Sequence, residues 1–96
     1  MDAGSVEGTL IAIWQRVLRR DHIDRHDQFF ALGGHPALLM LVGAEIRDAF
    51  GVELSQRLLF DGTDIASQAV LVACALLEEV RRLDPAAADR LLADQA

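Results

Sequence analysis

The sequence contains few or none of several residue types on which particular classes of protein depend. Its 96 residues include one cysteine, two prolines and no tyrosine, and aromatic residues make up only 5%. Since Cys74 has no second cysteine to pair with, an intramolecular disulfide and a thiolate metal cluster are excluded, and a reducing, cytoplasmic setting is expected. Lysine is absent, and nine arginines against fifteen acidic residues give a net charge of −6. A nucleic-acid partner is therefore not expected, because neutralising phosphates requires a basic face.

Long apolar runs are also missing. The longest extends from Ala37 to Ala44, which is far too short to span a bilayer, so no membrane association is expected. The first residues lack a basic region followed by an apolar stretch, so no secretory signal is predicted. Met1 favours a free-standing protein over a domain excised from a longer chain. Given the acidic balance, a charged partner is expected to be basic.

Hydrophobic residues are abundant, at 52% of the chain, which is enough for one small core. With so few aromatic residues, this core must consist mainly of Leu, Val, Ile and Ala, which suits packed helices better than sheets. Apolar residues recur at helical spacing in two long segments: Val6, Leu10, Ile13, Trp14, Val17 and Leu18, and Ile65, Ala69, Val72, Leu76 and Val80. The prediction is an all-α, four-helix bundle of three longer helices and one short helix in residues 1–83, followed by a helical tail in residues 84–96.

The ends of the predicted helices are marked by residues that suit them. The second helix is predicted from Pro36 to Phe50, because proline fits the first helical position and Gly51 can take the left-handed conformation that often ends a helix. A short third helix is predicted over residues 56–60 and a tail helix over 85–93, with a weak apolar edge at Leu91 and Leu92. Side-chain N-caps, which accept a hydrogen bond from the first turn, are predicted at Ser5, Ser55, Thr63 and Asp84.

Residues 21–34 lose helical periodicity and form a long connection between the first two helices. Its apolar residues are expected to anchor it in the core, as in a packed loop: Ile23, Phe29, Phe30 and Leu32. The following helix is expected to bury one stripe: Leu38 or Leu39, Val42, Ile46, Ala49 and Phe50.

A continuous motif joins this loop to the second helix. Residues 27–40 read Asp-Gln-Phe-Phe-Ala-Leu-Gly-Gly-His-Pro-Ala-Leu-Leu-Met. This resembles the signature of the peptidyl carrier, or thiolation, domains of nonribosomal peptide synthetases, Asp-x-Phe-Phe-x-Leu-Gly-Gly-His-Ser-Leu-x-x-Met, and the resemblance extends over residues 6–80. It implies a carrier-protein fold, 4′-phosphopantetheine as the family's cofactor, and biosynthetic enzymes of a nonribosomal peptide or related natural-product pathway as partners.

The chain departs from the signature at Pro36, where the family has the serine whose hydroxyl receives the 4′-phosphopantetheine arm. Proline has no nucleophilic oxygen, so no cofactor is expected on the chain as it stands. The leading hypothesis is a degenerate carrier-like module that acts by binding a partner enzyme. The alternative is a genuine acyl or aminoacyl carrier, in which Pro36 is an engineered replacement of the serine or the arm is attached elsewhere.

The second helix is apolar nearly all round its first two turns, which for a surface helix indicates burial against something beyond its own core. Four of its residues are expected to point outward: Ala37, Met40, Leu41 and Ala44. The resemblance implies that this face docks partner enzymes, and methionine is adaptable at such surfaces. Alternatively, the preceding loop folds over the face and hides it. Arg57 and Phe60 on the third helix are predicted to add to the partner-binding surface, and the tail is a further option.

No other constellation of residues indicates chemistry. His22 and His26 lie among three aspartates in residues 21–27, but the segment is irregular and no metal site is expected. Cys74 has apolar neighbours and is predicted to be a small buried or half-buried residue. The hydroxyl residues lie at predicted caps or on helix surfaces and none is set beside a histidine, so the chain is not expected to be an enzyme.

Overall fold

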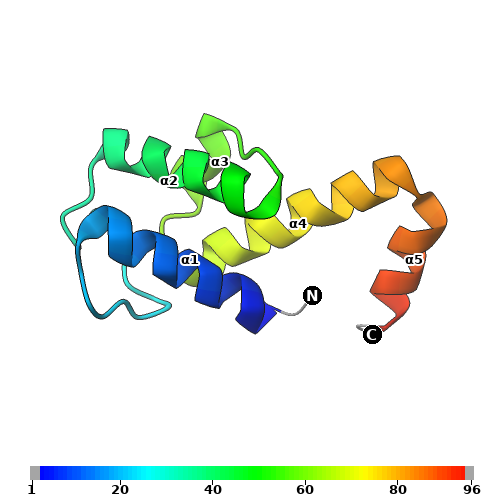
Figure 1. Cartoon of the computed structure of the whole chain (residues 1–96), viewed down its shortest axis with the longest axis horizontal. Helices are drawn as coiled ribbons and strands as arrows, with labels where there is room; N and C mark the ends of the chain where they lie inside the picture. Colours follow the sequence, from blue (N-terminus) through cyan, green and yellow to red (C-terminus); the bar gives the residue numbers. More distant parts are fainter. Residues whose placement is uncertain (1–2, 95–96) are drawn as a thin grey trace.

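The computed structural model describes residues 3–94, and all of the regular structure within this range is helical. Five helices follow one another: α1 (Ala3–Leu18), α2 (Pro36–Phe50), α3 (Gln56–Asp61), α4 (Ile65–Leu83) and α5 (Pro85–Asp94). α1 packs against both α2 and α4, and the short α3 packs on α2 (Figure 1). The predicted all-α bundle, with a long loop between its first two helices, is confirmed.

The hydrophobic core lies where α1, α2 and α4 meet the loop. Trp14 and Phe29 are the largest side chains in it, and their rings meet edge to face with centroids 5.0 Å apart. The predicted stripes supply most of the remaining core: Val6, Leu10, Ile13, Leu39, Val42, Ile46, Ile65, Ala69 and Val72. Ala49, which was predicted in the α2 stripe, is exposed, because Phe50 makes the contact with the core at the last turn.

Four of the predicted helix ends are confirmed. Pro36 is the first residue of α2, and Gly51 ends it with φ of 72°, donating its N–H to the Arg47 carbonyl at 2.9 Å. The Ser55 hydroxyl accepts a hydrogen bond from the Leu58 N–H at 3.2 Å at the start of α3. Likewise, the Asp84 carboxylate accepts one from the Ala87 N–H at 3.2 Å at the start of α5.

Two predicted N-caps are wrong. α1 begins at Ala3, so Ser5 lies inside the helix. α4 is capped by Asp64, whose carboxylate accepts the Ser67 N–H at 2.7 Å. A charged acceptor makes the stronger cap of the two neighbours. The Thr63 hydroxyl instead donates to the side-chain carbonyl of Gln28 at 2.7 Å, which ties the long loop to the start of α4.

The loop between α1 and α2 is packed and fixed, as predicted. Ile23 and Phe29 are buried, and the Phe29 N–H donates to the Thr63 carbonyl at 2.8 Å. Arg25 reaches back to α1 and pairs with both carboxylate oxygens of Glu7 at 2.7 Å. This side-chain hydrogen bond holds the pKa of Glu7 below its usual value. The loop therefore presents the start of α2 in a defined position.

The C-terminal half of α4 extends away from the bundle, and α5 packs on α4 at this end (Figure 1). The molecule is elongated as a result, with extents of 42 × 22 × 20 Å. Cys74 is exposed on this half, so its predicted burial is wrong. It follows the buried Val72 by two residues, which places it about 200° further round the helix. No helix within residues 3–94 is long and apolar enough to cross a membrane.

Candidate functional site

The turn that leads into α2 is shaped by close packing on Phe29. The Gly34 N–H donates to the Phe29 carbonyl at 3.1 Å. A Cβ on Gly34 would overlap the Phe29 ring and lie 2.8 Å from this carbonyl oxygen, so only glycine fits. The backbone then extends through His35, at φ of −141°, and enters the helix at Pro36. Residue 36 is thereby held at the exposed N-terminus of α2.

This helix start offers no hydroxyl group. Pro36 and its neighbours His35 and Ala37 are exposed. α2 contains no serine, threonine or tyrosine. The first two hydroxyl residues that follow along the chain are engaged elsewhere: Ser55 caps α3 and Thr63 bonds to Gln28. A covalent group that needs a hydroxyl nucleophile has no attachment point in this turn.

The outward face of α2 is apolar and uncovered. Met40 and Leu41 are 43% and 47% exposed, Ala37 is exposed and Ala44 is half-buried. The loop therefore does not fold over Met40 and Leu41, which answers the alternative left open by the sequence. Large exposed apolar side chains grouped at one helix start are typical of an interaction surface.

An aromatic pair extends this face onto α3. The Phe30 ring stacks on Phe60, with centroids 6.1 Å apart and an angle of 29° between the rings. Phe30 is 42% exposed and Phe60 36%, and Arg57 and Leu58 beside them are exposed as well. The predicted anchoring of Phe30 in the core is thus wrong, because its neighbour Phe29 takes the interior position. The start of α2, Phe30 and the outer side of α3 together form what we call the α2–α3 face.

Sequence reasoning missed Phe30 and Leu58 as part of this face. A signal for Phe30 did exist: it directly follows the buried Phe29, and adjacent residues in an extended or turning chain seldom point the same way. Leu58 gave a weaker signal, because α3 has only six residues and too short a pattern to show which side is buried.

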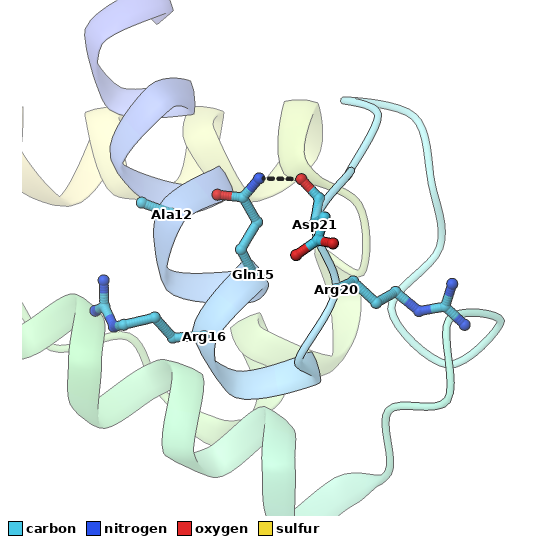
Figure 2. Close-up of a pocket in the computed structure, with 5 residues that line it drawn as sticks. All are labelled: Ala12, Gln15, Arg16, Arg20 and Asp21. Atoms are coloured by element: carbon cyan, nitrogen blue, oxygen red, sulfur yellow. Dashed lines mark hydrogen bonds between the residues drawn. The ribbon is translucent and has the colours of Figure 1, made fainter.

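A shallow hollow of about 390 Å³ lies beside the C-terminal part of α1 and does not resemble a ligand site. It is lined by Ala12, Gln15, Arg16, Arg20 and Asp21, and Gln15 donates to the Asp21 carbonyl at 2.8 Å across it (Figure 2). Arg16 and Arg20 point in opposite directions in Figure 2. Arg16 pairs with Glu45 at 2.7 Å and Arg20 donates to the Leu32 carbonyl at 2.9 Å, so the two cations do not converge on one anion.

The two histidines of the loop do not gather ligands around themselves. His22 and His26 are exposed, and His26 lies 3.5 Å from the Arg25 guanidinium. Within residues 3–94, no group of three or more His, Cys, Asp or Glu side chains is arranged to hold a metal ion.

Comparison with known proteins assigns this arrangement to a family. A family model described as "Phosphopantetheine attachment site" matches residues 8–72. The chain belongs to this carrier-domain family. The predicted resemblance to peptidyl carrier domains is confirmed, and carrier domains of this kind are non-catalytic. The match covers α1 from Gly8 onward, α2, α3 and the first part of α4, and it ends before the projecting half of α4.

The relatives are large synthetases, and the chain matches a short segment of each. Surfactin synthase subunit 3 from Bacillus subtilis is 43% identical over 61 residues, which are 64% of this chain and 5% of that protein. Tyrocidine synthase 3 from Brevibacillus parabrevis is 42% identical over 69 residues, which are 72% of this chain and 1% of that protein. The chain thus spans only a small part of the curated relatives that it matches.

Among solved structures, a peptidyl carrier protein in complex with the phosphopantetheine transferase Sfp and coenzyme A is 39% identical, with a TM-score of 0.69, over 72% of this chain and 90% of that chain. A docking domain complex of the Pax nonribosomal peptide synthetase, PaxA T1-CDD/PaxB NDD, is 30% identical with a TM-score of 0.78. It covers 95% of this chain and 85% of that chain, and so extends beyond the carrier core.

Proposed function

We propose that this carrier domain works in a nonribosomal peptide or related natural-product pathway as a partner-binding module that takes no phosphopantetheine arm at residue 36. The observation that carries the proposal is Pro36 at the exposed start of α2. The resemblance of residues 27–40 to the carrier signature implies that the family's attachment serine would stand at this position. Attachment needs a hydroxyl oxygen that attacks the β-phosphate of coenzyme A, and proline has none.

The α2–α3 face supports the second half of the proposal. Met40, Leu41 and the stacked Phe30–Phe60 pair are exposed to solvent, which does not stabilise the isolated fold. Their exposure therefore favours a binding role. Aromatic residues and methionine are enriched in the centres of protein interfaces. The face surrounds the position where a carrier presents its arm, so a partner enzyme that recognises carrier domains would meet it first.

The partners proposed for this face are biosynthetic enzymes of the pathway, in the cytoplasm. One similar structure is a peptidyl carrier protein bound to a phosphopantetheine transferase, and such a complex supports recognition of a carrier surface by a separate enzyme. The net charge of −6 favours a basic partner surface around the apolar contact.

A second binding role is proposed for the chain beyond residue 72. The observation in its favour is the match to the docking domain complex, which extends over 95% of this chain. This C-terminal part would serve docking between synthetase chains. The division into a carrier domain in residues 1–83 and a tail in residues 84–96 is proposed from the break between α4, which ends at Leu83, and α5, which begins at Pro85.

Intact-mass measurement tests the absence of the arm. The purified chain is incubated with a broad-specificity phosphopantetheinyl transferase, coenzyme A and Mg²⁺, and its mass is expected to stay unchanged. Pro36→Ser is expected to gain the mass of one arm, because it restores the hydroxyl at a helix start that tolerates serine. Pro36→Ala, which lacks a hydroxyl, is the matched control and should remain unmodified.

The outcomes separate the two hypotheses. A mass gain on the unaltered chain would overturn the proposal and support the covalent-carrier alternative, with the arm on another hydroxyl, which peptide mapping would locate. Efficient modification of Pro36→Ser alone would mean that the recognition surface is intact and that only the chemistry is missing.

A further inference from the structure

The apolar stripe of α4 continues beyond the core that it serves. Ile65, Ala69 and Val72 are fully or almost fully buried, and Leu76 is half-buried against the core. Leu83 follows Leu76 by seven residues and therefore lies on the same side of the helix, yet it is 71% exposed. The same side of α4 thus passes from the interior of the bundle into solvent.

This exposed end lies beyond the part of the chain that the family model matches. The family match ends at residue 72, about three turns before the end of α4. α5 packs on α4 and descends on the same side of it as α1 (Figure 1). Leu76, Val80 and Leu83, at spacings of four and three residues, form an apolar strip on α4, and we call it the distal strip.

The segment that carries the distal strip has more acidic than basic residues. Residues 73–94 contain five acidic residues and three arginines. Each arginine has a carboxylate of this same segment beside it: Arg81 with Glu78 at 2.9 Å, Arg82 with Glu79, and Arg90 with Asp84 at 4.0 Å. Asp89 is exposed on α5. A partner that binds the distal strip would meet a segment whose net charge is negative.

We infer that the distal strip is the binding site for an amphipathic helix from another synthetase chain. This helix would carry an apolar stripe with arginine or lysine residues on both sides of the stripe. A helix is the element that matches apolar residues spaced by three and four on α4, since helices pack along such ridges. Basic flanks are complementary to the net negative charge of residues 73–94. The inference rests on the docking role proposed above and assigns it a face, an occupant and a charge.

The test titrates the ¹⁵N-labelled full chain with a synthetic helical peptide that carries a leucine stripe flanked by arginines. Amide shifts are expected to be confined to residues 73–94, and Leu83→Glu is expected to weaken binding at least about tenfold, because it places a carboxylate in an apolar contact. Val70→Glu is the matched control: Val70 is 61% exposed on the same helix, about 140° round it from Leu83, and its change should leave binding as it was.

Several results would overturn the inference. Shifts centred on the α2–α3 face, equal binding of a peptide with glutamate flanks, no binding of the arginine peptide, or no effect of Leu83→Glu would each do so. Concentration-dependent shifts at Leu83 without peptide would assign the strip to a second copy of the chain instead. Leu41→Glu, which probes the α2–α3 face, should bind the peptide normally, so failure of this inference is distinguishable from failure of the partner-binding role proposed for the α2–α3 face.

Discussion

Trp14 donates its indole N–H to the side-chain carbonyl of Gln68 at 2.9 Å, and neither residue has exposed surface. The bond joins α1 to α4 at the centre of the core. The Gln68 amide also donates to the Gly62 carbonyl at 3.5 Å, just before α4 begins. Gln68 thus accepts a hydrogen bond from the buried Trp14 N–H on α1 and also donates one to the Gly62 carbonyl in the turn before α4.

Replacing Gln68 by methionine is expected to destabilise the fold by about 1–3 kcal/mol, because the change keeps the volume and leaves the Trp14 N–H buried without an acceptor. Urea unfolding followed by the fluorescence of Trp14, the only tryptophan, measures the change. Gln56→Met, at an exposed position of α3, is the control and should shift stability by less than about 0.5 kcal/mol. Equal effects at the two positions would argue against a structural role of the bond.

Gln68 also shows where sequence reasoning was incomplete. The period of α4 predicted Ile65, Ala69 and Val72 correctly, because burial of one side of a helix repeats regularly. Gln68 lies on the same side, but its polarity concealed it, since only a partner such as Trp14 makes a buried amide acceptable. The helix ends at Pro36 and Gly51 were predictable because backbone conformation there depends on the residue itself.

The cap of α4 provides a prediction about pH. Burial raises the pKa of Asp64, but hydrogen bonds from Ser67 and the nearby His26 and Arg25 outweigh this effect, so the pKa lies below its ordinary value. The cap therefore stabilises the fold fully above the unfolded-state pKa, at about 3.9, and loses its contribution as the pH falls through the lower folded-state value.

Asp64→Ala is expected to cost about 1 kcal/mol at neutral pH, since the Ser67 N–H loses its acceptor. Asp64→Asn keeps a good capping residue and removes the titration. Its stability relative to the unaltered chain should improve as the pH falls below about 4. Thermal melts between neutral and acidic pH measure both variants, and a constant difference for Asp64→Asn would contradict the assignment.

Replacing glycine by alanine is predicted to have opposite effects in the turn before α2 and inside α1. Gly34→Ala should destabilise the fold by about 2 kcal/mol, because the added methyl group overlaps the ring and crowds the carbonyl of Phe29, which is fully buried. Gly8→Ala should stabilise it by about 0.5–1 kcal/mol, because Gly8 is exposed inside α1 with no atom near its missing Cβ. Urea unfolding of both variants is the measurement, and an unharmed Gly34→Ala would mean that the turn can rearrange.

The candidate site was predictable only in part. Met40 and Leu41 were expected outside because α2 has more apolar residues than one stripe can bury. Phe30 was not, since loop residues have no period that separates inside from outside, and its stacking on Phe60 joins segments thirty residues apart. Contacts between distant segments depend on the tertiary fold and leave little trace in local sequence.

The last prediction separates stability from binding on α2. Leu41→Glu should change the free energy of unfolding by less than about 1 kcal/mol, because Leu41 is 47% exposed and its new carboxylate stays in water. Leu39→Glu, two residues away and without exposed surface, should cost about 4 kcal/mol or more, since it buries a charge in the core. In the Pro36→Ser background, Leu41→Glu should lower kcat/KM for arm transfer by a phosphopantetheinyl transferase at least about tenfold, because a carboxylate would enter the apolar contact.

A severe loss of stability in Leu41→Glu would mean that the chain itself covers this face. If neither stability nor transfer changes, the enzyme contacts other parts of the chain, with Arg57 and Phe60 on α3 the next to be altered.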